Sequence, residues 1–107
     1  MAEPTLYIYK IQPVRQEMLT EGSNPEEDRI ISAHFSYLEE PTRAGVVLLA
    51  GRTLTNEYAG FGIIIFGASS EQAARQLMLN DPAVMARVIR AELYPFRIAL
   101  LGELRES

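Results

Sequence analysis

The residues of this sequence best suited to proton transfer are one histidine and one aspartate. His34 is the only histidine among the 107 residues, and an imidazole takes up and releases protons near neutral pH. Ile30 and Leu38 lie at helical spacing from it, so we expect His34 on the inward face of a helix. A histidine packed in a hydrophobic core has the same pattern, and both interpretations stay open at this point.

The aspartate is Asp81, which directly precedes Pro82 and opens a short helical pattern. This is the position of an N-cap residue, and capping alone would explain an aspartate there. The capping and catalytic roles are compatible, because one carboxylate oxygen can accept a backbone N–H while the other orients an imidazole.

Two arginines are candidates for holding an anionic ligand. Arg52 lies at the end of an expected strand, and Arg15 lies in the connection before the first expected helix. A solvated charge is the alternative interpretation at both positions. Tyr7 and Tyr9 are predicted to pack on a sheet face rather than to donate protons.

The composition excludes several classes of protein. Fourteen acidic residues against ten basic ones give a formal charge of -4, whereas nucleic-acid binding needs a surplus of lysine and arginine. The absence of cysteine excludes disulfides, thiolate metal sites and a cysteine nucleophile. With a single imidazole we expect no metal site. No apolar run approaches the ~18 residues of a membrane span and no signal-peptide pattern opens the chain, so we expect a cytoplasmic protein.

The first helix has a recognisable start and end. Asn24 and Glu27 form a capping-box pair around Pro25, which suits the first helical position. Pro41 is expected to end or kink this helix, because proline offers no N–H and crowds the preceding turn. Gly45 is expected to close it.

Two further helices are expected later in the chain. The second should begin at Ser69, which forms a capping-box pair with Gln72. The third should begin at Asp81 and bury four apolar side chains: Val84, Met85, Val88 and Ile89.

The strands and their order predict the fold class. Apolar segments at residues 5–12, 45–54, 60–68 and 92–101 are expected as strands, the last at an edge because it contains Pro95. Together with the helices they predict a single domain over residues 1–107: an α+β, ferredoxin-like βαββαβ antiparallel sheet with helices on one face. Because the strands are apolar on both faces, we expect a homodimer to cover the other face.

Three short motifs resemble the YCII-related (YciI-like) domain family. They are HFSYL at residues 34–38, AGVVLLAG at 44–51 and NDP at 80–82. MLT at 18–20 and PEE at 25–27 are similar to one branch of that family. The likeness extends from the first strand to about residue 101.

The resemblance implies a dimeric α/β-barrel with a pocket built around His34 and Asp81. Asp81 would fix the ring tautomer and favour the protonated ring, and His34 would move a proton on a small bound molecule. Tyr37, within the first motif, joins Arg15 and Arg52 as a ligand-binding candidate. The implied activity is a cofactor-free lyase or isomerase, with a dehydrochlorinase of chlorinated hydroxyhydroquinones as a precedent.

The sequence departs from the family pattern at the expected pocket. Arg52 stands where the family usually has proline, and Ala83 stands where an aromatic residue is common, so substrate identity does not carry over. The alternative function is a non-catalytic small-molecule-binding or regulatory module with the same pocket. Cofactor-free oxygenation is a third hypothesis, against which the absence of tryptophan counts.

Overall fold

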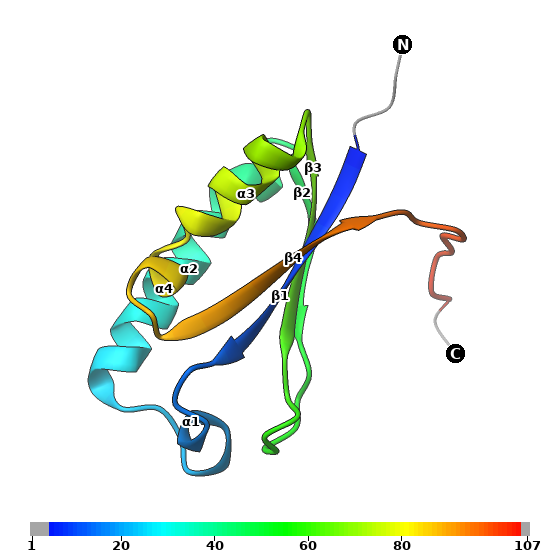
Figure 1. The fold of residues 1–107 in the computed structure, drawn as a ribbon. Helices are drawn as coiled ribbons and strands as arrows, with labels where there is room; N and C mark the ends of the chain where they lie inside the picture. Colours follow the sequence, from blue (N-terminus) through cyan, green and yellow to red (C-terminus); the bar gives the residue numbers. More distant parts are fainter. Residues whose placement is uncertain (1–4, 106–107) are drawn as a thin grey trace.

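A four-stranded antiparallel sheet forms the centre of the computed structural model, which describes residues 5–105 (Figure 1). Its spatial order is β2-β3-β1-β4. The strands are β1 (Thr5–Pro13), β2 (Val47–Arg52), β3 (Gly62–Ala68) and β4 (Ile89–Phe96). The helices are α1 (Glu17–Thr20), α2 (Pro25–Arg43), α3 (Glu71–Leu79) and α4 (Pro82–Met85).

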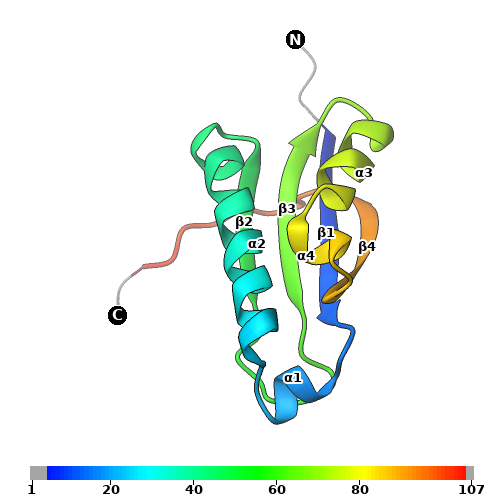
Figure 2. The same cartoon turned by 90° about the vertical axis from the view of Figure 1, so that its left-hand side faces the viewer.

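The helices α2, α3 and α4 lie together on one face of this sheet (Figures 1 and 2). The strand order and the single helical layer confirm the predicted ferredoxin-like α+β fold. The one-turn α1 was not expected from the sequence. None of the helices within residues 5–105 is long and apolar enough to cross a membrane.

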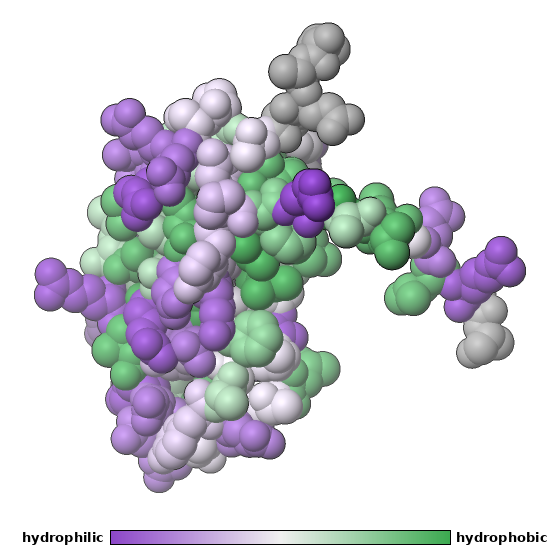
Figure 3. Space-filling view, turned by 45° about the vertical axis from the view of Figure 1, so that its right-hand side comes forward, coloured by the Kyte–Doolittle hydropathy of each residue, from purple (hydrophilic) through white to green (hydrophobic). Residues whose placement is uncertain are grey.

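The core lies between the sheet and the helices. Tyr7 and Tyr9 of β1 and Ile64 and Phe66 of β3 are buried there, since alternate residues of a strand point to the same face. The predicted packing of Tyr7 and Tyr9 on a sheet face is confirmed, and the intervening residues are partly exposed on the opposite side. We call that opposite side the outer face, and Figure 3 views it obliquely.

The ends of α2 follow from local chemistry. The Asn24 side chain accepts the Glu27 N–H, and the Glu27 carboxylate accepts the Asn24 N–H, so the predicted capping box is confirmed. Pro41 lies inside the helix, which continues to Arg43. Gly45 then takes a positive φ of 79°, as expected of a closing glycine.

The segment from α3 to β4 departs from the sequence prediction. Ser70 rather than Ser69 caps α3, because its side chain accepts the Ala73 N–H. The helix α4 spans a single turn, and Ile89 already begins β4 instead of continuing the helix. The strand β4 therefore starts earlier than predicted and ends at Phe96, although its place at the sheet edge is confirmed.

Candidate functional site

The candidate catalytic pair is in direct contact between α2 and α4. His34 Nδ1 lies 2.6 Å from Asp81 Oδ2. Asp81 is fully buried and His34 is 8% exposed. The two residues are 47 positions apart in the sequence, so only the packing of α2 against α4 brings them together.

The Asp81 carboxylate accepts two further hydrogen bonds besides the one with His34. Its Oδ1 accepts the Ala83 N–H at 3.0 Å, which is the predicted N-cap of α4. Its Oδ2 also accepts the Tyr9 hydroxyl at 2.8 Å. A buried carboxylate needs such donors to offset the loss of water. Capping and ring contact therefore occur in the same residue.

Tyr9 is the site residue that sequence reasoning missed. It packs in the core as predicted, but its hydroxyl also points at the carboxylate. Burial first, and then the neighbouring charge of Asp81, raise the pKa of Tyr9 far above its usual range, so the phenol stays a neutral donor. The available signal was the rule that a buried tyrosine hydroxyl finds a hydrogen-bond partner.

The contacts of Asp81 determine which nitrogen of His34 carries the proton in the neutral ring. A carboxylate only accepts hydrogen bonds, so Nδ1 must be the donor and Nε2 keeps a lone pair. Nε2 has no partner among residues 5–105, yet every buried side-chain nitrogen and oxygen there is paired. Nε2 therefore reaches the molecular surface, where a ligand or water can meet it.

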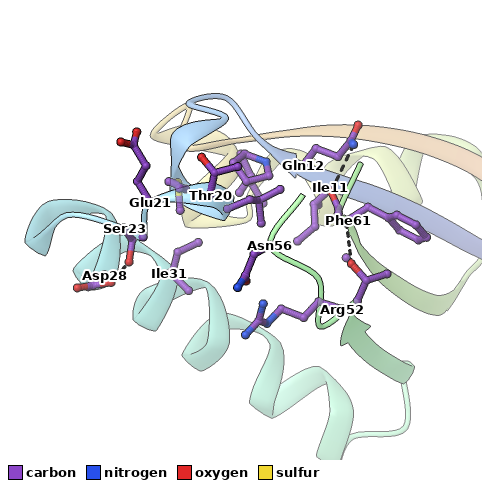
Figure 4. A pocket seen from close by; sticks show the side chains of 18 of the residues that line it. Ile11, Gln12, Thr20, Glu21, Ser23, Asp28, Ile31, Arg52, Asn56 and Phe61 are labelled. Atoms are coloured by element: carbon purple, nitrogen blue, oxygen red, sulfur yellow. Dashed lines mark hydrogen bonds between the residues drawn. The ribbon is translucent and has the colours of Figure 1, made fainter. Parts of the chain in front are cut away.

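An open groove of about 820 Å³ lies between the start of α2 and one end of the sheet (Figure 4). Its walls come from the segment around α1, from one side of α2, from the ends of β1 and β2, and from the starts of β3 and β4. It is lined by apolar residues including Ile11, Met18, Ile31 and Phe61, and by polar residues including Gln12, Thr20, Asn56 and Arg52.

The histidine–aspartate pair does not itself line the groove but adjoins its lining. Ile11 lines the groove and lies on the same face of β1 as Tyr9. Residues two positions apart on one strand face are neighbours. Ile31 lies one helical turn before His34, so the two are neighbours on α2. The groove lining thus includes a neighbour of Tyr9 on β1 and a neighbour of His34 on α2.

Arg52 is the predicted ligand-binding residue that lines the groove. It ends β2 on the helix-covered side of the sheet, where it pairs in register with Gly62. Figure 4 shows its side chain extending into the groove near Asn56. No carboxylate of residues 5–105 lies within ion-pair distance of its guanidinium.

Arg15 is bonded within the protein instead of facing the groove. Its guanidinium donates to both carboxylate oxygens of Glu27, at 2.8 and 2.6 Å, and to the Gly22 carbonyl at 3.1 Å. The hydrogen bond from Arg15 is the main reason that the pKa of Glu27 falls to about 2. This pair ties the α1 segment, which forms one wall of the groove, to the start of α2.

Tyr37 also lies outside the groove lining. Its hydroxyl donates to the Leu77 carbonyl at 2.6 Å and so joins α2 to α3. Burial, followed by the charge of Asp81, raises its pKa. Of the three predicted ligand-binding residues, only Arg52 therefore lines the groove.

Comparison with known proteins agrees with the sheet order and helical layer, which define the chain as a ferredoxin-like α+β protein. A similar solved structure is 5-chloro-2-hydroxyhydroquinone dehydrochlorinase from Burkholderia phenoliruptrix, in complex with 2,5-dihydroxybenzoquinone. The TM-score is 0.64 at 21% identity, over 86% of this chain and 93% of that chain. At this identity the likeness concerns the fold.

The family follows from the sequence itself. The family model of the YCII-related domain matches residues 6–97, and the chain belongs to that family. This confirms the resemblance carried by the three short motifs. No curated protein sequence matches the chain.

Proposed function

We propose that this protein is a small-molecule enzyme that transfers protons without a cofactor. His34 is the catalytic residue, and Asp81 orients its ring. The observation that carries the proposal is the 2.6 Å contact between His34 Nδ1 and a fully buried carboxylate. Such a contact leaves Nε2, the outward nitrogen of the neutral ring, free to act as a base.

The proposed step begins with Nε2 taking a proton from an acidified C–H or O–H of the substrate. The ring becomes an imidazolium, which the Asp81 carboxylate stabilises through Nδ1. Tyr9 and the Ala83 N–H hold that carboxylate in place. The imidazolium then returns the proton to another atom of the substrate or to its leaving group, which gives an isomerase or a lyase.

The groove favours a small cyclic or aromatic anion as the substrate. Ile11, Ile31 and Phe61 provide apolar contact area, and Arg52 provides a positive charge without an ion-pair partner among residues 5–105. Arg52 would neutralise a carboxylate or an enolate of the substrate. Arg15 and Tyr37 enter this proposal as residues that hold the walls around the site.

The enzyme is proposed to act as a homodimer whose subunits pack through the outer face. On that face β1, β3 and β4 carry Ile8, Ile65 and Tyr94 side by side in register. An apolar sheet face without a helical layer favours packing against another protein surface, and twofold symmetry is the commonest arrangement.

A binding or regulatory module remains the second candidate function. It is favoured by one observation, which is that His34 and Asp81 do not line the groove. In that case the groove would hold a ligand without transforming it, and the buried pair would serve to cap and position α4.

Deuterium exchange distinguishes the two candidates without knowledge of the natural substrate. The protein is incubated in D₂O with a panel of cyclic acids and enolisable ketones, including 2,5-dihydroxybenzoquinone, and carbon-bound deuterium is followed by NMR. We expect exchange that falls about 10²–10⁴-fold in His34→Ala, the usual contribution of a general base. Phe35→Ala, next on α2 and 70% exposed, is the matched control. Probes that bind tightly yet never exchange would establish the binding module instead.

A further inference from the structure

The segment after β4 is largely exposed, with only Ile98 partly buried. Residues 97–105 leave the end of β4 and project on the side of the sheet opposite the helices (Figures 1 and 2). Leu100, Leu101 and Leu104 are 95%, 81% and 102% exposed. We call this segment the C-terminal arm. Three largely exposed leucines in nine residues leave apolar area that another surface would gain stability by covering.

The outer face is apolar on the same side of the molecule. Its apolar side chains are Leu6, Ile8, Leu49, Ile63, Ile65, Tyr94 and Phe96, and the charged Lys10 and Glu92 lie on the same face. Leu49 and Tyr94 are each 47% exposed. In Figure 3 hydrophobic side chains of the upper part of this side continue into the projecting arm. The arm and the face thus form one apolar region that the chain does not cover by itself.

We propose that the C-terminal arm is a clasp that packs its leucines against a second copy of this chain. The inference rests on the proposed homodimer and adds a second contact region to it. The occupant is a second copy because the arm and the outer face are both unpartnered, apolar and directed to the same side. A twofold contact uses each surface twice, so each copy covers the arm of the other.

The dimensions of the arm agree with this arrangement. Packed sheets lie about 10 Å apart, and residues 97–105 can span up to about 30 Å when extended. The arm of one copy therefore reaches past the sheet interface onto the body of its partner. Folding back onto its own sheet would instead occupy the surface that the second sheet needs.

The clasp would also support the groove. Arg52, Thr53 and Phe61 line both the groove and a smaller hollow of about 260 Å³ that includes Leu49 and Ile63 of the outer face. A second copy packed over Leu49 and Ile63 would stabilise this shared wall from the outer face. Dimer formation and ligand binding are therefore expected to strengthen each other.

The test combines an arm variant with a measurement of assembly. Leu100, Leu101 and Leu104 are replaced together by serine, and association is measured by sedimentation velocity over a dilution series. We expect the dimer dissociation constant to rise at least ~100-fold, since three apolar contacts are lost. Leu79→Ser, a 45% exposed leucine on the helical layer, is the control that leaves assembly unchanged.

A tryptophan placed in the arm reports on packing directly, because the chain contains none of its own. Leu101→Trp should emit at short wavelength in the dimer and shift to the solvent-exposed wavelength on dilution. A triple variant that dimerises as tightly as the parent, or exposed emission in the dimer, would overturn the clasp while leaving the sheet-face dimer standing. A parent chain that stays monomeric would overturn both. Deuterium exchange lost in His34→Ala tests the enzymatic proposal separately.

Discussion

The buried pair and the adjoining groove contrast in almost every physical property. Asp81 is fully buried, and its carboxylate binds three donors, from Tyr9, His34 and the Ala83 N–H. The groove is open, and Arg52 reaches into it without an ion-pair partner among residues 5–105. The polar groups of the buried pair are satisfied within the protein, whereas Arg52 in the groove stays available to a ligand.

This contrast separates two requirements of a proposed enzyme. An orienting carboxylate works best where its own position is held by several hydrogen bonds and water is excluded. A recognition site needs unpaired groups that a ligand can satisfy. His34 belongs to the buried pair through Nδ1, its Nε2 reaches the surface, and Ile31, one turn earlier on α2, lines the groove.

The largest expected effect comes from Asp81→Ala, which removes the carboxylate of the buried pair. This change leaves the Tyr9 hydroxyl and the His34 ring without their acceptor and removes the cap of α4. At ~1–3 kcal/mol for each orphaned donor and ~1 for the cap, the free energy of unfolding should fall by about 3 kcal/mol or more. Urea unfolding followed by circular dichroism measures it. Asp28→Ala, an exposed acid on the groove rim, is the control, and an equal loss in both would contradict the contrast.

A subtler change, Asp81→Asn, tests the orientation of the ring. An amide presents both a donor and an acceptor, so it no longer requires a proton on His34 Nδ1. We expect the parent ring to be protonated on Nδ1 and the variant to lose that preference, at a stability cost of about 1–2 kcal/mol. Ring ¹⁵N shifts give the answer without assignment, since His34 is the only histidine. A parent ring protonated on Nε2 alone would refute the proposed base.

In the open region, Arg52→Gln should weaken binding of an anionic probe and spare a neutral one. We expect the dissociation constant of benzoate to rise about tenfold, or ~1.4 kcal/mol, and that of phenol to stay unchanged. Calorimetric titration measures both. Arg43→Gln, which removes the same charge at the far end of α2, should leave both constants unaltered. Equal weakening of benzoate by the two variants would assign the effect to net charge.

The smallest effect concerns the ion pair that ties the groove wall to α2. The pKa of Glu27 is about 2 in the folded protein against an ordinary 4.5. A depressed pKa stabilises the fold above pH 4.5, and this contribution disappears as the pH falls toward 2. The stability difference between the parent and Glu27→Gln should therefore shrink over that range. Urea unfolding at several pH values tests this, and a difference that does not change with pH would exclude the mechanism.

Local signals predicted much of the fold. The capping box at Asn24 and Glu27 and the closing turn at Gly45 depend on residues only a few positions apart, so neighbouring sequence suffices. The packing of Tyr7 and Tyr9 on one face of β1 was likewise predictable, because side chains of a strand alternate with a period of two. The prediction was wrong where a local pattern competed with long-range pairing. A helix was predicted through Ile89, but Ile89 begins β4, which pairs with the distant β1.

The sequence by itself therefore determined the ferredoxin-like order of elements, the cap at Asp81 and the inward position of His34. Only the tertiary structure decided that these two residues touch across 47 positions, that Tyr9 joins them across 72, and that Arg15 binds Glu27 instead of facing the groove. The physical reason is how far apart along the sequence the interacting residues lie. Caps and alternation are set by neighbours along the chain, whereas a hydrogen bond between distant elements exists only once their packing has fixed both side chains.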